Sequence, residues 1–208
     1  MRKRLTTVLL SSTAAALALG LGATTATASS IASTWTVKPG GSVKASGSGQ
    51  VKDANTGTVA KCSSIKMAGT LKKGKGLSGK AIGTIKTGSF TGCKIATVSV
   101  TVKVRGLPWK LNAASFKNGV TTGTISGIDL KATAPGCSAT LDGTGAGKNN
   151  GVTKISYSNS TGKLKLLPSG GNLHSYAVSG CFGLVNNGDA QQASGTETIS
   201  PKQTITSP

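Results

Sequence analysis

Strand-period alternation restricts the fold of this chain more than any other feature of its sequence. Residues 98–104 read VSVTVKV, so valine occupies every second position. Alternation of this kind places the valines on one face of a β-strand and the polar residues on the other. Weaker alternation occurs in four further segments, at 128–132, 137–141, 154–157 and 163–166. Turns rich in glycine, asparagine and proline separate these segments, and no helical period follows residue 28, so we expect an all-β fold, an antiparallel β-sandwich or β-barrel.

The first 28 residues have the organisation of a secretory signal peptide. A basic start, MRKR, precedes an apolar stretch that ends near Leu21, and Ala26-Thr27-Ala28 supplies the small residues of a cleavage site. The apolar stretch is short and interrupted by serine and threonine, which argues against a membrane anchor. We therefore expect residues 1–28 to be removed and residues 29–208 to form a single secreted β domain, extracellular or associated with the cell envelope, with no transmembrane segment.

Four cysteines remain in the exported chain: Cys62, Cys93, Cys137 and Cys181. An even number of cysteines in an oxidising compartment favours two disulfides. No C-x-x-C spacing occurs, which argues against zinc, so we expect neither a metal site nor a cofactor. Four cysteines allow three connectivities.

An internal similarity favours one of these connectivities. A Cys-Ser pair opens, and a Gly-Cys pair closes, each of the two segments 62–93 and 137–181. This favours the pairs Cys62–Cys93 and Cys137–Cys181 over the other two arrangements. It also suggests that the domain consists of two related halves, around residues 58–105 and 133–185. Chance similarity in a chain rich in glycine, serine and threonine is the alternative explanation.

The chain is strongly basic, with 24 Lys and Arg residues against five Asp and Glu and a formal net charge of +19. A field of one sign attracts anionic polymers, so we consider anionic wall polymers or acidic surfaces as partners. After residue 28 the one arginine is Arg105, and aromatic residues do not alternate with the lysines. We therefore expect no specific nucleic-acid binding. One group of lysines is a candidate for weak, diffuse anion binding: Lys72, Lys73, Lys75 and Lys80. The oligomeric state is left open.

Two patterns in the sequence suggest catalysis or nucleotide binding but lack the residues that this chemistry needs. Residues 74–81, GKGLSGKA, have the spacing of a phosphate-binding glycine loop, but Ala81 stands where serine or threonine is required, and we interpret the segment as a basic loop between strands. His174 is the single histidine, and no serine lies in a G-x-S-x-G elbow. A catalytic set would have to join His174 to Asp129, Asp142, Asp189 or Glu197, so we assign no catalytic residues.

Four segments resemble a group of small secreted disulfide-containing proteins of actinomycetes that have no assigned activity. They are GLPWKLNA at 106–113, GVTTGTI at 119–125, GGNLH at 170–174 and the terminal ISPKQTITSP at 199–208. The resemblance covers nearly all of the exported chain. It implies a secreted β protein with disulfides and supplies no catalytic residue.

We expect a secreted, non-enzymatic β protein that associates electrostatically with anionic cell-envelope polymers. One alternative is a small secreted hydrolase acting on a polymer, which requires a cluster that joins His174 to an acidic residue. The second alternative is a carrier of a small apolar ligand, which requires an internal cavity lined by strands such as the one at Val98–Val104.

Overall fold

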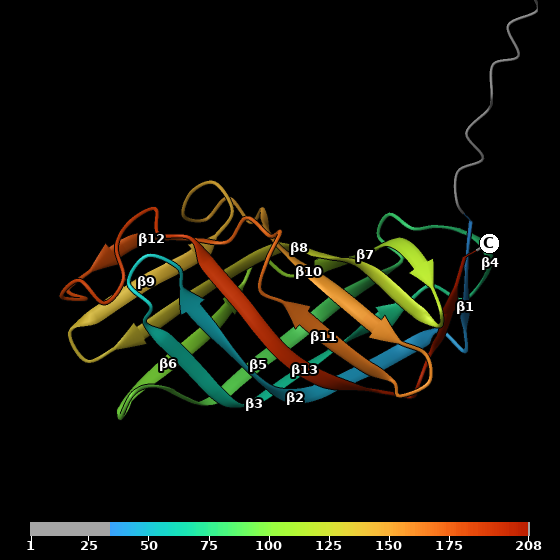
Figure 1. Ribbon diagram of the computed structural model, residues 1–208, viewed down its shortest axis with the longest axis horizontal. Helices are drawn as coiled ribbons and strands as arrows, with labels where there is room; N and C mark the ends of the chain where they lie inside the picture. Colours follow the sequence, from blue (N-terminus) through green and yellow to red (C-terminus); the bar gives the residue numbers. More distant parts are fainter. Residues whose placement is uncertain (1–33, 208) are drawn as a thin grey trace, which may run out of the picture. The chain divides into compact units, whose positions relative to one another are not determined.

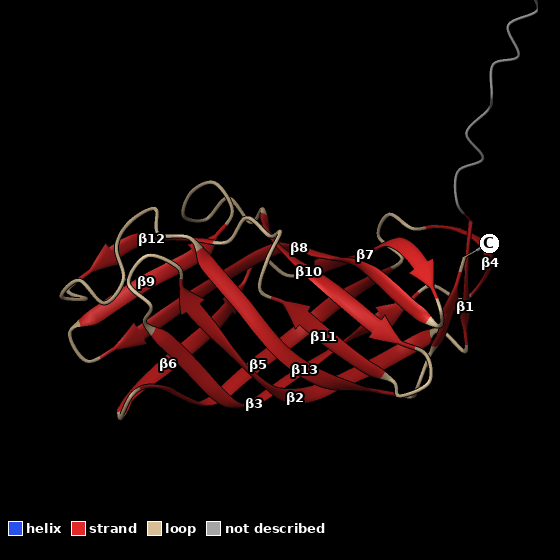
Figure 2. Ribbon diagram, in the orientation of Figure 1, coloured by secondary structure: helices blue, strands red, loops and turns tan. Residues whose placement is uncertain are grey.

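The protein consists of antiparallel strands joined by turns. The computed structural model describes residues 34–207, so the predicted signal peptide lies outside the described residues. The described residues belong to one compact unit, Ala32–Pro208, and contain no helix (Figure 2). The expectation of an all-β, antiparallel fold is therefore confirmed. Nor do residues 34–207 include a helix long and apolar enough to cross a membrane.

Fourteen strands make up this unit (Figure 1). In chain order they are β1 (Thr34–Lys38), β2 (Gly41–Asp53), β3 (Val59–Leu71), β4 (Gly74–Ser78), β5 (Gly83–Ile95), β6 (Val98–Arg105), β7 (Trp109–Lys117), β8 (Val120–Ala134), β9 (Cys137–Asp142), β10 (Gly151–Ser158), β11 (Lys163–Leu167), β12 (His174–Ser179), β13 (Gln191–Ser200) and β14 (Thr204–Thr206).

The larger of the two sheets closes on itself. Its order runs from β10 through β11, β13, β2, β3 and β5 to β6 and β8, and β8 also pairs with β10. β6 and β7 share one position in this sequence of strands, because both lie between β5 and β8, at different ends of those two strands. We call the closed set, β2, β3, β5–β8, β10, β11 and β13, the strand ring. Its inward side chains form one apolar core, which includes Ile65, Trp109, Ile125 and Ile155.

A three-stranded sheet, in the order β14, β1 and β4, adds its apolar side chains to the same core, at the right of Figure 1. Trp35, Val37 and Ile205 of this sheet are almost fully buried. The Tyr157 hydroxyl of β10 donates to the Gln203 carbonyl at 2.8 Å and accepts from the Gln203 amide at 2.9 Å. The interpretation of residues 74–81 as a loop was wrong for its first half, because residues 74–78 form β4 and pair with β1.

The two disulfides are Cys62–Cys93 and Cys137–Cys181, as the sequence similarity predicted. The first joins directly opposed residues of β3 and β5, and the second joins the start of β9 to the residue that follows Gly180, just after β12. Gly92 and Gly180 precede the closing cysteines and have positive φ angles of 60° and 67°; Gly92 lies at a shift in strand register within β5, and Gly180 follows the end of β12. A glycine adopts this conformation without steric cost, which explains the repeated Gly-Cys pair. Disulfides of this number indicate maturation in an oxidising environment.

Candidate functional site

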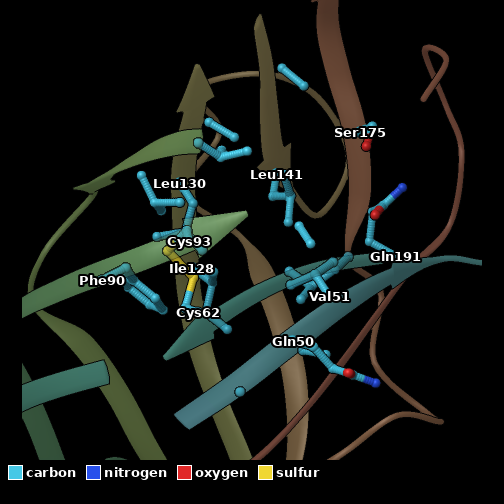
Figure 3. A pocket seen from close by; sticks show the side chains of 18 of the residues that line it. Gln50, Val51, Cys62, Phe90, Cys93, Ile128, Leu130, Leu141, Ser175 and Gln191 are labelled. Atoms are coloured by element: carbon cyan, nitrogen blue, oxygen red, sulfur yellow. A yellow bond between two sulfur atoms is a disulfide. The ribbon is translucent and has the colours of Figure 1, made fainter. Parts of the chain in front are cut away.

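The interior of the strand ring contains an apolar cavity of about 160 Å³. It lies toward the end that carries β9 and β12, and its walls include residues of β2, β3, β5, β6, β8, β9, β12 and β13 (Figure 3). Phe90, Ile128, Leu130 and Leu141 are among the side chains that line it. The disulfide Cys62–Cys93 forms part of the same wall.

The strand with the clearest sequence alternation contributes directly to this cavity. Val100 and Val102 of β6 line it, and Val104 packs against the buried core. Val98, at the start of the strand, is instead 46% exposed. The alternation therefore identified the inward face of a strand that forms part of the cavity wall. Val98, the first residue of that strand, lies outside the cavity.

One side of the cavity is polar. Asp53, Ser175 and Gln191 line it together, and Figure 3 shows Ser175 and Gln191 across from the disulfide. Gln191 Nε2 donates to Asp53 Oδ2 at 2.6 Å, and Asp53 Oδ1 accepts from the amides of Asn55 and Thr56 at 2.9 Å each. Ser175 Oγ is fully buried and has no hydrogen-bond partner among the described residues. The cavity thus combines a large apolar wall with a polar side that includes the fully buried, unpartnered hydroxyl group of Ser175.

A second apolar cavity, of about 70 Å³, lies nearer the three-stranded sheet. Its lining includes Leu71, Ile85, Tyr157 and Ile205. Met67 of β3 lines both cavities. An unbranched thioether side chain adapts its shape easily, so the wall residue that the two cavities share is of an adaptable type.

Charge is divided between the inside and the outside of the protein. All five acidic residues are buried, with exposed fractions of at most 6%, whereas every lysine between residues 34 and 207 is exposed. The buried acidic residues are Asp53, Asp129, Asp142, Asp189 and Glu197. Asp129 pairs with Arg105 across β8 and β6, at 2.6 Å. The outer surface of the described residues therefore carries positive charge with no exposed carboxylate beside it.

Two of the buried carboxylates are held by amide donors. Burial raises the pKa of Asp142, but hydrogen bonds from the backbone amides of Asn150, Gly143 and Asn149 outweigh it and hold that pKa below its ordinary value. Burial likewise raises the pKa of Asp189, and hydrogen bonds from Asn186 and Asn55 outweigh it and lower that pKa. Both carboxylates therefore remain ionised under ordinary conditions.

Glu197 of β13 differs from the other four acidic residues. It is fully buried, neither carboxyl oxygen has a hydrogen-bond partner among residues 34–207, and burial raises its pKa to about 7. Its cross-strand neighbours are Gly47 on β2 and Leu164 on β11. The side chain extends toward Gly195, so that Oε1 lies 3.3 Å from the position that a Cβ atom there would occupy. A carboxyl group without a donor is thus enclosed by apolar side chains and bare backbone.

The predicted anion-binding lysines lie together in sequence but form no cavity. Lys72 and Lys73 lie between β3 and β4, Lys75 is in β4, and Lys80 is in the turn before β5. All four are exposed. A specific role in anion binding stays a prediction.

His174 has no hydrogen-bonded carboxylate partner. Its Nδ1 lies 2.8 Å from the Asn172 carbonyl, and its ring is tilted against Tyr176. Asp142 is its cross-strand neighbour, but the Asp142 carboxylate accepts hydrogen bonds from backbone amides of residues 143 and 149–151. Within residues 34–207, no three His, Cys, Asp or Glu side chains gather as a metal site requires. The geometry therefore supplies no His-carboxylate pair for the hydrolase alternative.

Sequence reasoning missed Ser175, and it considered Glu197 as a partner for His174 but not as an isolated buried carboxyl group. A signal for Glu197 was present, because it shares the inward phase of β13 with Ala193 and Ile199. A charged residue at an apolar position of an alternating strand indicates a buried ionisable group. For Ser175 the phase was misleading, since Tyr176 and Val178 form the apolar phase of β12, yet Ser175 is the buried residue.

A family model described as "Alkane oxidation protein activator PraA/PraB-like" matches residues 1–207 of the chain. Neither the curated proteins nor the solved structures contained a match. The family match covers the whole domain, and it does not single out the secreted actinomycete proteins that the sequence resembles.

Proposed function

The chain belongs to the PraA/PraB-like family of alkane oxidation protein activators, and on that premise we propose that it is an exported, non-enzymatic carrier of a small alkane-like molecule. The ligand occupies the 160 Å³ cavity of the strand ring. The family description refers to alkane oxidation, and alkanes belong to the chemical class that an apolar cavity accepts. Activation would then consist of keeping hydrocarbon dissolved outside the cell, because the protein shields it from water.

The cavity is the observation that carries this proposal. Empty apolar volume costs a protein about 24 cal/mol per Å³, or about 4 kcal/mol for a cavity of this size. An aliphatic cavity of about this volume stays dry and accepts benzene. A molecule with six or so carbon atoms would restore the missing contacts, and displacement of Met67 would admit a longer chain into the second cavity.

The predicted signal peptide and the two disulfides support export. The resemblance to secreted actinomycete proteins points in the same direction. An extracellular position would place the cavity where hydrocarbon is encountered before it enters the cell.

Filling the cavity should weaken ligand binding strongly while leaving the fold intact. Ala193 points into the cavity from β13, so Ala193→Leu is expected to weaken hexane binding at least tenfold, measured by displacement of the fluorescent apolar probe N-phenyl-1-naphthylamine. The matched control is Ala114→Leu, an exposed position on β7. Ala193→Leu should unfold at the same or a higher denaturant concentration than the parent, since it fills empty volume. Undiminished hexane binding in a folded Ala193→Leu protein would refute the proposed site.

Electrostatic association with anionic envelope polymers is a second function, favoured by the division of charge between surface and interior. Exposed lysines with no exposed carboxylate among them attract phosphate-bearing surfaces diffusely. Such an association would hold the carrier close to the cell.

Binding to phosphatidylglycerol vesicles should therefore fall by at least a hundredfold between about 50 and 200 mM salt. Replacing Lys72, Lys73, Lys75 and Lys80 with glutamine should weaken this binding about as much as replacing Lys154, Lys163, Lys165 and Lys202, because the attraction is diffuse. Phosphatidylcholine vesicles are the control. Retention that does not change with salt would contradict an electrostatic role.

A further inference from the structure

Ser175 is buried in a wall that gives its hydroxyl group no partner. Its backbone is fully engaged, since its amide donates to the Asp189 carbonyl at 2.9 Å and its carbonyl accepts from the Gly188 amide at 2.7 Å. The side chain has an exposed fraction of 0% and lines the 160 Å³ cavity. A buried hydroxyl without a hydrogen bond is costly to the folded state, which an alanine at the same position would avoid.

The surroundings of Ser175 discriminate between polar ligand groups. Asp53 lines the same side of the cavity, and Asp189, whose pKa is lowered, lies close to it. Asn55 links the two carboxylates. Its backbone N–H donates to Asp53 Oδ1, and its side-chain Nδ2 donates to Asp189 Oδ1 at 2.7 Å. Two carboxylates near this position disfavour a ligand that carries its own negative charge. The Gln191 side-chain amide donates one N–H to Asp53 Oδ2 and the other to the Asp189 carbonyl, so it offers no free N–H donor in this arrangement. A neutral group that both donates and accepts a hydrogen bond fits best.

We propose that the carried ligand is a terminally hydroxylated alkyl chain, a primary alcohol, and that Ser175 Oγ binds its hydroxyl group while the alkyl chain fills the apolar part of the cavity. This inference rests on the proposed carrier function and specifies its ligand. A primary alcohol is the first oxygenated product of a terminal alkane carbon, so the protein would bind a product of alkane oxidation in preference to the alkane.

Glu197 is the other buried side chain without a partner, and it occupies a different place. It lies six positions beyond Gln191 along β13, and the linings of the two cavities do not include it. Of these two fully buried groups without a partner, Ser175 is the one that lines the larger cavity.

The test compares three ligands of equal chain length by probe displacement: hexane, 1-hexanol and hexanoate. In the parent protein, 1-hexanol should bind several-fold to tenfold more tightly than hexane, and hexanoate should bind most weakly at neutral pH. Ser175→Ala should weaken 1-hexanol binding about tenfold and leave hexane binding unchanged. The matched control is Ser115→Ala, which removes an exposed hydroxyl on β7 that lies outside both cavities and pairs with Thr122 Oγ1 at 2.6 Å.

The outcomes separate this inference from the carrier function. If hexane and 1-hexanol bind equally tightly and Ser175→Ala changes neither affinity, the assignment of Ser175 as the hydroxyl-binding group is overturned, while the proposed carrier function stands. If Glu197→Gln removes the preference for 1-hexanol and Ser175→Ala does not, the polar end of the ligand lies elsewhere and the assignment is likewise overturned. If none of the ligands displaces the probe from the parent protein, the carrier function itself fails, and the inference fails with it.

Discussion

Glu197→Gln is expected to raise the free energy of unfolding by about 3 kcal/mol at pH 8 and to change it little at pH 4. Burial raises the pKa of Glu197 from 4.5 to about 7, because the ionised carboxyl group has neither water nor a donor beside it. The folded state therefore binds this proton more tightly than the unfolded state. The protein keeps the associated stability below pH 4.5 and loses it as the pH rises through 7, at about 1.4 kcal/mol for each unit of pKa difference. Glutamine has the same shape and cannot ionise, so the variant escapes this loss.

Denaturant unfolding of both proteins at pH 4 and pH 8 measures the effect. Asp142→Asn is the control with the opposite sign, because backbone amides lower the pKa of Asp142. A carboxylate with a lowered pKa stabilises the folded state above the unfolded pKa and loses that contribution on acidification. Asp142→Asn should therefore destabilise the protein at pH 8 and less so at low pH. Equal stability of parent and Glu197→Gln at pH 8 would show that Glu197 is hydrated or partnered in solution.

Removing both disulfides is expected to have the largest effect on stability. The bonded cysteines are 31 and 44 residues apart, and loops of this size predict a contribution of about 4 kcal/mol from each bond. The combined loss, about 8 kcal/mol, matches the whole stability of many domains. The variant with serine at all four cysteine positions should therefore be largely unfolded at 37 °C, as circular dichroism and thermal melting would show.

Two double variants, each lacking one disulfide, separate the contributions of the two disulfides to stability. Cys62→Ser with Cys93→Ser removes a link within the strand ring, where β3 and β5 pair along most of their length. Cys137→Ser with Cys181→Ser instead frees β12, whose strand partner is β9. We expect the second variant to be cleaved by protease between residues 180 and 190 before it unfolds as a whole. A fourfold serine variant as stable as the parent would contradict the entropic contribution assigned to these bonds.

Much of the fold could be predicted from local sequence patterns. Alternation identified β6 and parts of β8–β11, and the repeated Gly-Cys pair identified the disulfides because a positive φ is needed before each closing cysteine. Closure of the ring depends on β8 pairing with β10, and assembly of the small sheet depends on residues 34–38 meeting 204–206. Such contacts join segments far apart in the chain, and no short pattern encodes them.

The candidate site was predicted less completely. The apolar alternative required a cavity behind the valines of β6, and Val100 and Val102 do line one. Composition could not reveal that every acidic side chain lies inside, since that depends on strand phase at each position. It could not reveal Ser175 either, because the more apolar phase of β12 lies on the other face.

Confinement of the acidic residues to the interior also governs how copies of the protein behave toward one another. Two approaching molecules present lysine ammonium groups and the partly exposed Arg105 guanidinium to each other across their described surfaces, with no exposed carboxylate to bridge them. Mutual repulsion should keep the molecules dispersed and unaggregated at low ionic strength, and this protection should disappear at strongly basic pH, where the lysines lose their charge.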